Sequence, residues 1–243
     1  MRVLILSDIH GNIDALRAVH ERVRRDHFDE IWVLGDLVDY GGAPLEVVEW
    51  VRASATRVVR GNHDHAMGTG DDCRSAPLYH DLAVATRAHF RSRLDAEILA
   101  YLSSLPLEDR VTLSPGGRAV LVHASPGDPL FGYVPTGGSD ETWRNALRPA
   151  SDVRLVFVGH THDQFTRTVD GTLIVNPGSV GLPKDGDPRA AFAILDGESI
   201  SLERTSYDTE QAASRLSTLS LSWDQHHRLS TLIRYARLPN PGS

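Results

Sequence analysis

The fold of this chain is decided by residues 31–39, which read Ile-Trp-Val-Leu-Gly-Asp-Leu-Val-Asp. Four apolar residues followed by Gly35 and Asp36 are typical of a buried strand that ends at the edge of a sheet. A carboxylate in that position can reach solvent and the side chains of neighbouring strands. Asp36 is therefore the central candidate for a functional site.

Four other apolar runs also end in Asp, Asn or His. They lead to Asp8 and His10 after residues 3–6, Asn62 and His63 after residues 58–59, His123 after residues 120–122, and His160 and His162 after residues 155–158. A single His near a strand end is usually a hydrogen-bonded loop residue. Five such strand ends in one chain predict that their polar side chains meet at one sheet edge.

Two of these segments repeat the same spacing. Asp8 and His10 are two positions apart, and so are His160 and His162. In an extended segment, positions i and i+2 face the same way. We therefore expect the two side chains of each pair to point together into the site.

The first quarter of the chain alternates strands and helices. Strands are predicted for residues 1–7, 31–34 and 56–60, and helices for residues 13–25 and for residues 44–51, which begin at a proline. This alternation is typical of α/β proteins.

The second half of the chain favours hairpins. Strand-like pairs flank Pro-Gly-Gly or Asp-Gly turns at residues 111–122, 165–175 and 191–204. With the strands above, they predict an α/β fold that is a two-sheet β-sandwich of mixed strands flanked by helices.

One domain is expected over residues 1–205, with a helical insertion at residues 65–115. Within the insertion, residues 78–94 and 96–104 are predicted helices. The insertion lies between two strands that carry site residues, so it is either a substrate lid or a packing layer, and the sequence leaves both open. Residues 206–243 are expected to form a C-terminal helical extension packed on the same domain, with the last six residues frayed.

Composition excludes several classes of protein. A formal charge of −7 and a pI near 5.9 argue against an extended nucleic-acid surface, which needs clustered Lys and Arg. No apolar run is long enough to span a membrane. Cys73 is the single cysteine and is expected to be an ordinary loop or surface residue. We expect a cytoplasmic protein, and nothing indicates its oligomeric state.

Taken together, five motifs resemble the calcineurin-like metallophosphoesterase superfamily, in particular its small prokaryotic phosphatases and phosphodiesterases. They are Asp8-x-His10, Gly35-Asp36-x-x-Asp39, Gly61-Asn62-His63-Asp64, the lone His123, and Gly159-His160-x-His162. The resemblance covers about residues 1–205 and implies the four-layer α-β-β-α fold of that superfamily. It also implies a metal-dependent phosphoester hydrolase.

Carried over by position, the resemblance implies two divalent transition metal ions. The first would be held by Asp8, His10, Asp36 and His162, and the second by Asp36, Asn62, His123 and His160. Imidazole, carboxylate and amide ligands without thiolate suit manganese, our first expectation, and also iron, zinc or nickel. Two divalent ions and two carboxylates leave a charge of roughly +2, which suits an anionic phosphoester.

The resemblance further implies catalytic roles for His63 and Asp39. His63 would contact the phosphate and act as a general acid on the leaving group. Asp39 would orient His63 and raise its pKa, although a carboxylate at this position could instead cap a turn. For Asp64, a loop carboxylate that bonds nearby backbone is the simpler expectation.

The sequence departs from the protein phosphatases of the superfamily after Asp39. Those enzymes usually carry Arg at the next position, and here Tyr40 stands there. Arg60 could compensate, although a strand-end arginine in solvent is the simpler expectation. Asn12 could touch phosphate or shape its turn.

Three functions therefore remain open. The first is a phosphatase acting on a small phosphoester or a phosphoprotein. The second is a phosphodiesterase acting on nucleotides or short nucleic acid, because the same site serves both. The third is a non-catalytic metal-binding scaffold. That third reading is disfavoured because every expected ligand position still holds a competent residue.

Overall fold

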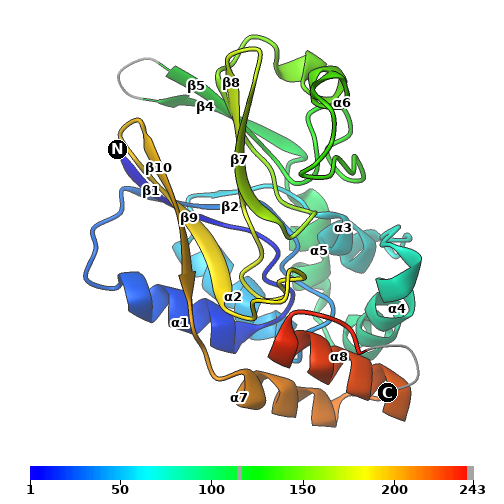
Figure 1. Ribbon diagram of the computed structural model, residues 1–243. Coiled ribbons are helices and arrows are strands. Elements are labelled where there is room, and N and C mark those ends of the chain that lie inside the picture. The colour runs from blue at the N-terminus through cyan, green and yellow to red at the C-terminus, as the bar shows by residue number, and fades with distance from the viewer. Residues whose placement is uncertain (114–116, 240–243) are drawn as a thin grey trace.

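The computed structural model describes residues 1–113 and 117–239, and within them ten strands form two five-stranded sheets (Figure 1). The first sheet has the order β10-β9-β1-β2-β3. Its strands are β1 (Arg2–Leu6), β2 (Glu30–Val33), β3 (Arg57–Val58), β9 (Ala190–Asp196) and β10 (Ser199–Thr205). β1, β2 and β3 are parallel, whereas β9 runs antiparallel to both β1 and β10.

The second sheet has the order β4-β5-β6-β8-β7. Its strands are β4 (Glu108–Leu113), β5 (Gly117–Val122), β6 (Leu155–Phe157), β7 (Gln164–Val169) and β8 (Thr172–Pro177). β5, β6 and β8 are parallel, and the edge strands β4 and β7 pair with them in the antiparallel sense.

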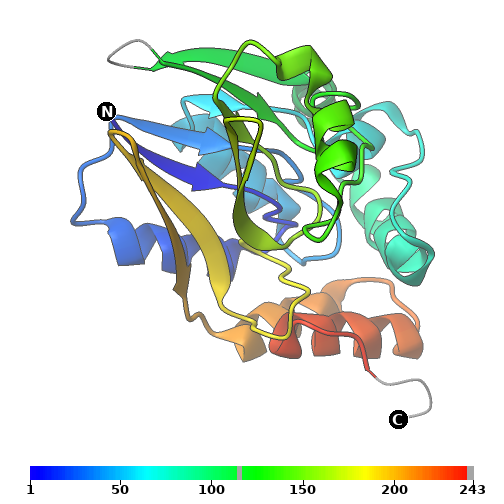
Figure 2. The ribbon, with the colours of Figure 1, turned by 45° about the horizontal axis from the view of Figure 1, so that its top comes forward.

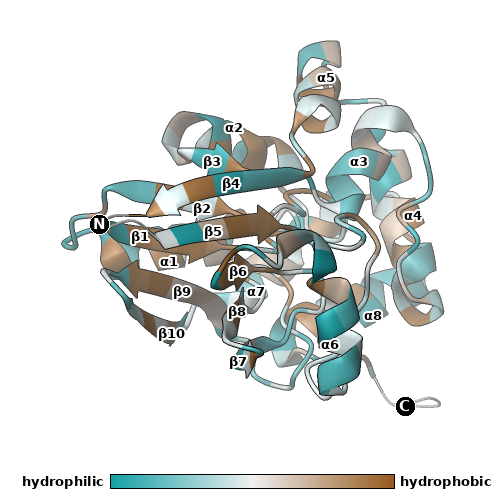
Figure 3. Ribbon diagram, turned by 90° about the horizontal axis from the view of Figure 1, so that it is seen from above, coloured by the Kyte–Doolittle hydropathy of each residue, from teal (hydrophilic) through white to brown (hydrophobic). Residues whose placement is uncertain are grey.

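Alternation along the strands explains the layers. Val3 and Ile5 of β1 face the second sheet in a core that includes Trp32 and Phe157. Leu4 and Leu6 of β1 point to the other face of the first sheet. They pack there on α1 (Ile13–Val23) and α2 (Pro44–Ser54). Figure 3 shows the strands mostly in brown between more polar helices.

The outer face of the second sheet is covered by α6 (Asp140–Ala146) and by the short 3₁₀ helix Arg148–Ala150, with Trp143 buried in that layer. The order helix, sheet, sheet, helix confirms the predicted fold. In Figure 2, the blue arrows of β1 and β2 end side by side.

The predicted hairpins at residues 165–175 and 191–204 are confirmed by the pairs β7–β8 and β9–β10. Asp170 and Gly171 have φ values of 48° and 82°, as the Asp-Gly turn requires. β4 pairs with β5 as predicted, but the Pro-Gly-Gly turn between them lies largely outside the described residues. The same is true of most of the C-terminal end that we expected to fray.

The insertion contains the two predicted helices, α4 (Pro77–Arg91) and α5 (Ala96–Ser104). The expectation that Asp64 lies in a loop was wrong, because α3 (Asn62–Thr69) begins directly at the Gly-Asn-His-Asp motif. Asp64, at the third position of this helix, accepts a hydrogen bond from the backbone nitrogen of Gly61 at 3.0 Å and so closes its first turn.

The C-terminal part forms α7 (Thr209–Ser214), the 3₁₀ helix Arg215–Thr218 and α8 (Trp223–Tyr235). Leu229, Leu232 and Ile233 of α8 are buried in a cluster that also contains Tyr40 and Leu82. These helices therefore pack beside α4 and beneath the loop that follows β2 (Figure 1). Among the described residues, none of the helices has the length and apolar character that crossing a bilayer demands.

Candidate metal centre and active site

The candidate site residues follow the strands in sharply turned backbone. The residues with positive φ include Asp8 (53°), His10 (48°), Asp36 (57°), His160 (65°) and His162 (65°). Our expectation that each pair converges because its segment is extended was therefore wrong. The side chains converge because left-handed residues turn the chain immediately after each strand, a strained conformation that often occurs at functional sites.

Hydrogen bonds between loops hold these turns. The backbone nitrogen of Asp8 donates to the carbonyl of Gly35 at 3.0 Å, and that of His10 donates to the carbonyl of Asp36 at 2.9 Å. Close approach also requires glycine, since a Cβ atom on Gly61 would lie 2.0 Å from Asp36 Oδ1. The Gly-Asn and Gly-Asp motifs thus pack against each other through their backbones.

Three residues form a first cluster, namely Asp8, His10 and His162. His10 Nδ1 donates to the carbonyl of Val38 at 2.9 Å, and His162 Nδ1 donates to the carbonyl of Leu182 at 2.5 Å. Both Nε2 atoms therefore present lone pairs, and they face each other at 3.2 Å.

Asp8 adds a third acceptor to this cluster. Ser7 and the backbone nitrogen of His160 donate to Asp8 Oδ2. Asp8 Oδ1 is buried without a hydrogen-bond partner in the described part of the chain and lies 3.3 Å from His162 Nε2. His10 Nε2 and Asp8 Oδ1 converge on His162 Nε2, and such a set of acceptors is the arrangement that a cation stabilises.

A second cluster contains Asp36, Asn62, His123 and His160. Asn62 Oδ1 lies 3.0 Å from His123 Nε2 and 3.1 Å from His160 Nδ1. His123 Nδ1 donates to the carbonyl of Leu34, which leaves Nε2 as the ligand atom. Asn62 Nδ2 donates to the carbonyl of Cys73 at 2.6 Å, which turns the amide oxygen toward the cluster.

Asp36 lies between the two clusters. Its Oδ2 atom is 3.2 Å from His123 Nε2 and 3.7 Å from His10 Nε2, and its Oδ1 accepts from the backbone nitrogen of His63. Although burial opposes ionisation, His123 and His63 hold the pKa of Asp36 well below its usual range. An ionised carboxylate that faces both clusters is suited to bridge two cations.

The side chains fit two divalent cations in charge and in ligand type. Burial lowers the pKa values of His10 and His162, so both imidazoles are neutral and able to bind metal. Burial and the neighbouring His123 lower the pKa of His160 to about 3. The sequence-predicted ligands are thus all brought together, and their assignment to individual ions stays a prediction.

His63 does not belong to either cluster. Its Nδ1 lies 2.7 Å from Asp39 Oδ2, while Nε2 is 4.0 Å from Asp36 Oδ2. Despite the opposing effect of burial, Asp36 and Asp39 raise the pKa of His63 to about 10, so it carries a proton at neutral pH. The contact with Asp39 is the geometry expected of an orienting carboxylate.

Sequence reasoning missed Arg87 of α4. Its Nη2 and Nε atoms donate to Asp39 Oδ2 at 2.7 and 3.1 Å, in a buried ion pair. Arg87 and Asp39 are separated by 48 residues, and no motif joins them. The pair ties the insertion to the candidate site.

Other side-chain expectations need correction. Cys73 is fully buried and contacts Ser75, so it is not a surface residue. Arg60 is half-buried and bonds the carbonyl of Ser103, so it neither lies free in solvent nor reaches the site. Asn12 shapes its turn by capping α1 through Ala15. Asp64 accepts from the nearby backbone nitrogen of Gly61, as expected, and also from those of Asp36 and Leu37, which ties the Gly-Asn motif to the Gly-Asp motif.

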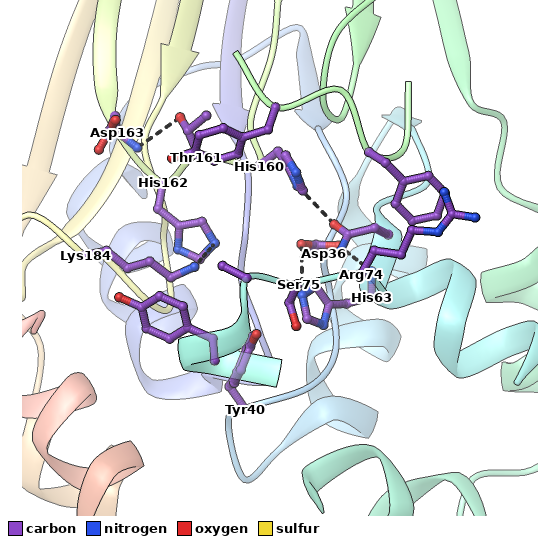
Figure 4. A pocket seen from close by; sticks show the side chains of 15 residues that line it. Asp36, Tyr40, His63, Arg74, Ser75, His160, Thr161, His162, Asp163 and Lys184 are labelled. Atoms are coloured by element: carbon purple, nitrogen blue, oxygen red, sulfur yellow. Dashed lines mark hydrogen bonds and ion pairs between the residues drawn. The ribbon is translucent and has the colours of Figure 1, made fainter. Parts of the chain in front are cut away.

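A pocket of about 440 Å³ opens above the clusters (Figure 4). Its walls carry two cations that the sequence reasoning did not select. Arg74 lies over the ring of Phe131 at 4.3 Å, and Lys184 lies over the ring of Tyr79 at 4.5 Å. Burial lowers the pKa of Lys184 to about 8.

Comparison with known proteins agrees with this geometry. A solved metallophosphoesterase from Sphaerobacter thermophilus is 33% identical with a TM-score of 0.77, and the match covers 97% of this chain and 99% of that one. An uncharacterised protein from Methanocaldococcus jannaschii is 29% identical over 232 residues, which cover 88% of this chain and 91% of that protein.

A more local similarity is to the symmetrical bis(5'-nucleosyl)-tetraphosphatase of Yersinia pestis, which is 43% identical over 67 residues. These residues are 26% of this chain and 23% of that enzyme. The family model of the calcineurin-like phosphoesterase superfamily domain matches residues 1–199. The chain therefore belongs to the calcineurin-like phosphoesterase superfamily, a divalent-metal-dependent family, and is a phosphoester hydrolase.

Proposed function

We propose that this protein hydrolyses phosphoesters with two divalent metal ions, of which manganese is the expected species. The proposal depends on the position of Asp36, whose Oδ2 atom faces ligand nitrogens of both clusters. The first ion would be held by Asp8, His10, Asp36 and His162, and the second by Asp36, Asn62, His123 and His160. When bound, the two ions would acidify a water molecule and neutralise charge on the phosphoryl oxygens.

The remaining chemistry belongs to His63. It carries a proton at neutral pH and lies beside the bridging carboxylate, so it is placed to protonate the leaving oxygen. Asp39 holds Nδ1 of this ring, and Arg87 in turn holds Asp39, so Nε2 is the atom that faces the substrate. The left-handed turns keep the ligand side chains in place before substrate binds.

We propose a phosphatase that acts on a small phosphoester or a phosphoprotein. The pocket volume of about 440 Å³ suits a small molecule or a single side chain. Phosphodiester hydrolysis of nucleotides is the alternative, supported by the local similarity to the tetraphosphatase and by the aromatic rings of Phe131 and Tyr133 at the pocket. With a single cysteine and no disulfide, the chain suits a reducing compartment, and we propose the cytoplasm.

The test compares an aryl phosphomonoester with its bis-aryl diester, with and without added manganese. Hydrolysis of either ester should depend on metal and should be lost in Asp36→Asn, because the bridging charge disappears. Full activity in Asp36→Asn would refute the bridging assignment. Inactivity of the wild type on both esters, with two metals found by elemental analysis, would instead favour the scaffold alternative.

A further inference from the structure

Lys184 is the single lysine of the chain, whose other 24 residues of the Lys and Arg total of 25 are all arginine. It lies in the loop between β8 and β9 and lines the pocket. Its Nζ atom is 3.2 Å from His162 Nε2, and Figure 4 shows the two side chains pointing toward each other. The ammonium group thus lies directly beside the first cluster.

A second donor, the hydroxyl group of Tyr40, also lines the pocket. The Tyr40 side chain is 1% exposed, and its hydroxyl group lies near Ser75 but forms no well-aligned hydrogen bond among residues 1–113 and 117–239. Its ring packs 4.9 Å from the ring of His10 and 5.0 Å from that of His63. An unpaired buried hydroxyl that lines a polar pocket indicates that a ligand supplies its partner.

The two donors are connected by the first cluster. The ring of His162 stacks on that of His10 at 5.0 Å, so a continuous series of contacts runs from Lys184 through His162 and the buried His10 to Tyr40. Arg74 and Lys184 both lie over aromatic rings, but only Lys184 also contacts a candidate ligand nitrogen, that of His162. Both donors therefore lie next to residues of the first cluster, Lys184 beside His162 and the ring of Tyr40 beside His10.

The contact between Lys184 and His162 is incompatible with metal binding through the same nitrogen. The Nε2 lone pair of His162 can bind a cation or accept from Lys184, but not both. Lys184 has no ion pair with a carboxylate in the described ranges, so its charge would then need a new acceptor. The pocket is where that acceptor must lie, because Lys184 lines it.

We propose that Lys184 and Tyr40 bind a non-bridging oxygen of a phosphomonoester dianion, and that this contact makes the pocket select monoesters over diesters. A terminal phosphoryl group has three non-bridging oxygens, whereas a diester has two. Two cations can engage two of these oxygens, so only the monoester keeps a further charged oxygen for these donors. This inference rests on the proposed function and decides between its two substrate classes.

The kinetic test uses Lys184→Met, which removes the charge and keeps an unbranched side chain, and Tyr40→Phe, which removes only the hydroxyl. The values of kcat/KM are measured for an aryl monoester and a bis-aryl diester with the same leaving group. For Lys184→Met we expect a monoester loss of about 10- to 100-fold, as for a lost charge-assisted hydrogen bond. The diester value should change less than about threefold, and Tyr40→Phe should have a smaller effect in the same direction.

Two control variants distinguish direct contact between Lys184 and the phosphate from the general effect of losing one positive charge. Arg189→Gln removes an exposed positive charge five residues farther along the chain, outside the pocket, and should leave the monoester-to-diester ratio unchanged. Lys184→Arg keeps the charge and should recover most of the ratio. Equal losses on both esters in Lys184→Met would overturn the inference.

A second readout needs no turnover. Because Lys184 is the single lysine, acetylation followed by peptide mass mapping reports its exposure, with the N-terminal amine as internal reference. Inorganic phosphate with manganese should slow acetylation of Lys184 in the wild type and leave the reference unchanged.

The two readouts distinguish the two hypotheses. If the wild type hydrolyses neither ester, the proposed function fails, and acetylation still tests whether Lys184 binds phosphate. If hydrolysis occurs and phosphate inhibits it without protecting Lys184, the inference is wrong and the proposed function stands.

Discussion

The two clusters differ in how they are enclosed. Asp8, His10 and His162 of the first cluster are all buried, and carbonyl groups fix both imidazoles through Nδ1. In the second cluster His160 is only partly buried and lines the open pocket. We therefore expect a metal ion at the first cluster to be bound more tightly than one at the second cluster, where His160 is open to solvent.

The largest effect should come from the first cluster. Asp8→Asn removes the buried carboxylate charge of the first cluster. Asp8 Oδ1 has no hydrogen-bond partner in the described residues, so it is the oxygen expected to bind the ion. We expect kcat/KM to fall at least about 100-fold, since several kcal/mol of charge stabilisation are lost with the ion. Elemental analysis should find about one metal per chain, and retention of two would contradict the assignment.

A smaller effect is expected from the second cluster. His160→Ala removes its most open ligand and should weaken metal binding by about 10- to 100-fold without abolishing it. Activity measured against manganese concentration should recover at high metal in this variant and should not recover in Asp8→Asn. If His160→Ala and Asp8→Asn respond identically to manganese, the proposed difference in metal affinity between the two clusters is wrong.

The smallest effect concerns the proton on His63 and not the metal ions. Its pKa is raised from 6.5 to about 10, so the imidazolium is present below that pH and lost above it. Asp39→Asn removes one of the charges that raise this pKa and should move the alkaline limb of kcat to lower pH. Both metals should be retained. If the alkaline limb of kcat does not move in Asp39→Asn, a group other than His63 determines that limb.

Much of the fold was predictable because β-strands and their turns have strong local signals. Asp170-Gly171 predicted a hairpin, and the continuous apolar run of residues 3–6 predicted a strand, which is buried on both faces as such runs usually are. The residues that cluster at the candidate site were predictable because each closely follows an apolar run. Their left-handed backbone was not, since it depends on hydrogen bonds between loops such as that from His10 to Asp36.

Other features escaped prediction because they depend on tertiary contacts. The Arg87–Asp39 pair requires α4 to pack over the site, and no local pattern marks it. Cys73 was expected to be a loop or surface residue, and it does lie in a loop, but that loop buries it beside Asn62. Lys184 lies in the loop between β8 of the second sheet and β9 of the first sheet. Its position therefore depends on how the two sheets pack together.

The packing of Tyr40 on the C-terminal part of the chain links that part to the candidate site. The family model ends at residue 199, so α7 and α8 lie outside the residues that it matches. Leu216 of the 3₁₀ helix and Leu229 of α8 lie in the same apolar cluster as Tyr40. Because the ring of Tyr40 also packs against the rings of His10 and His63, truncating the chain before α7 should loosen the aromatic wall of the site as well as the C-terminal layer.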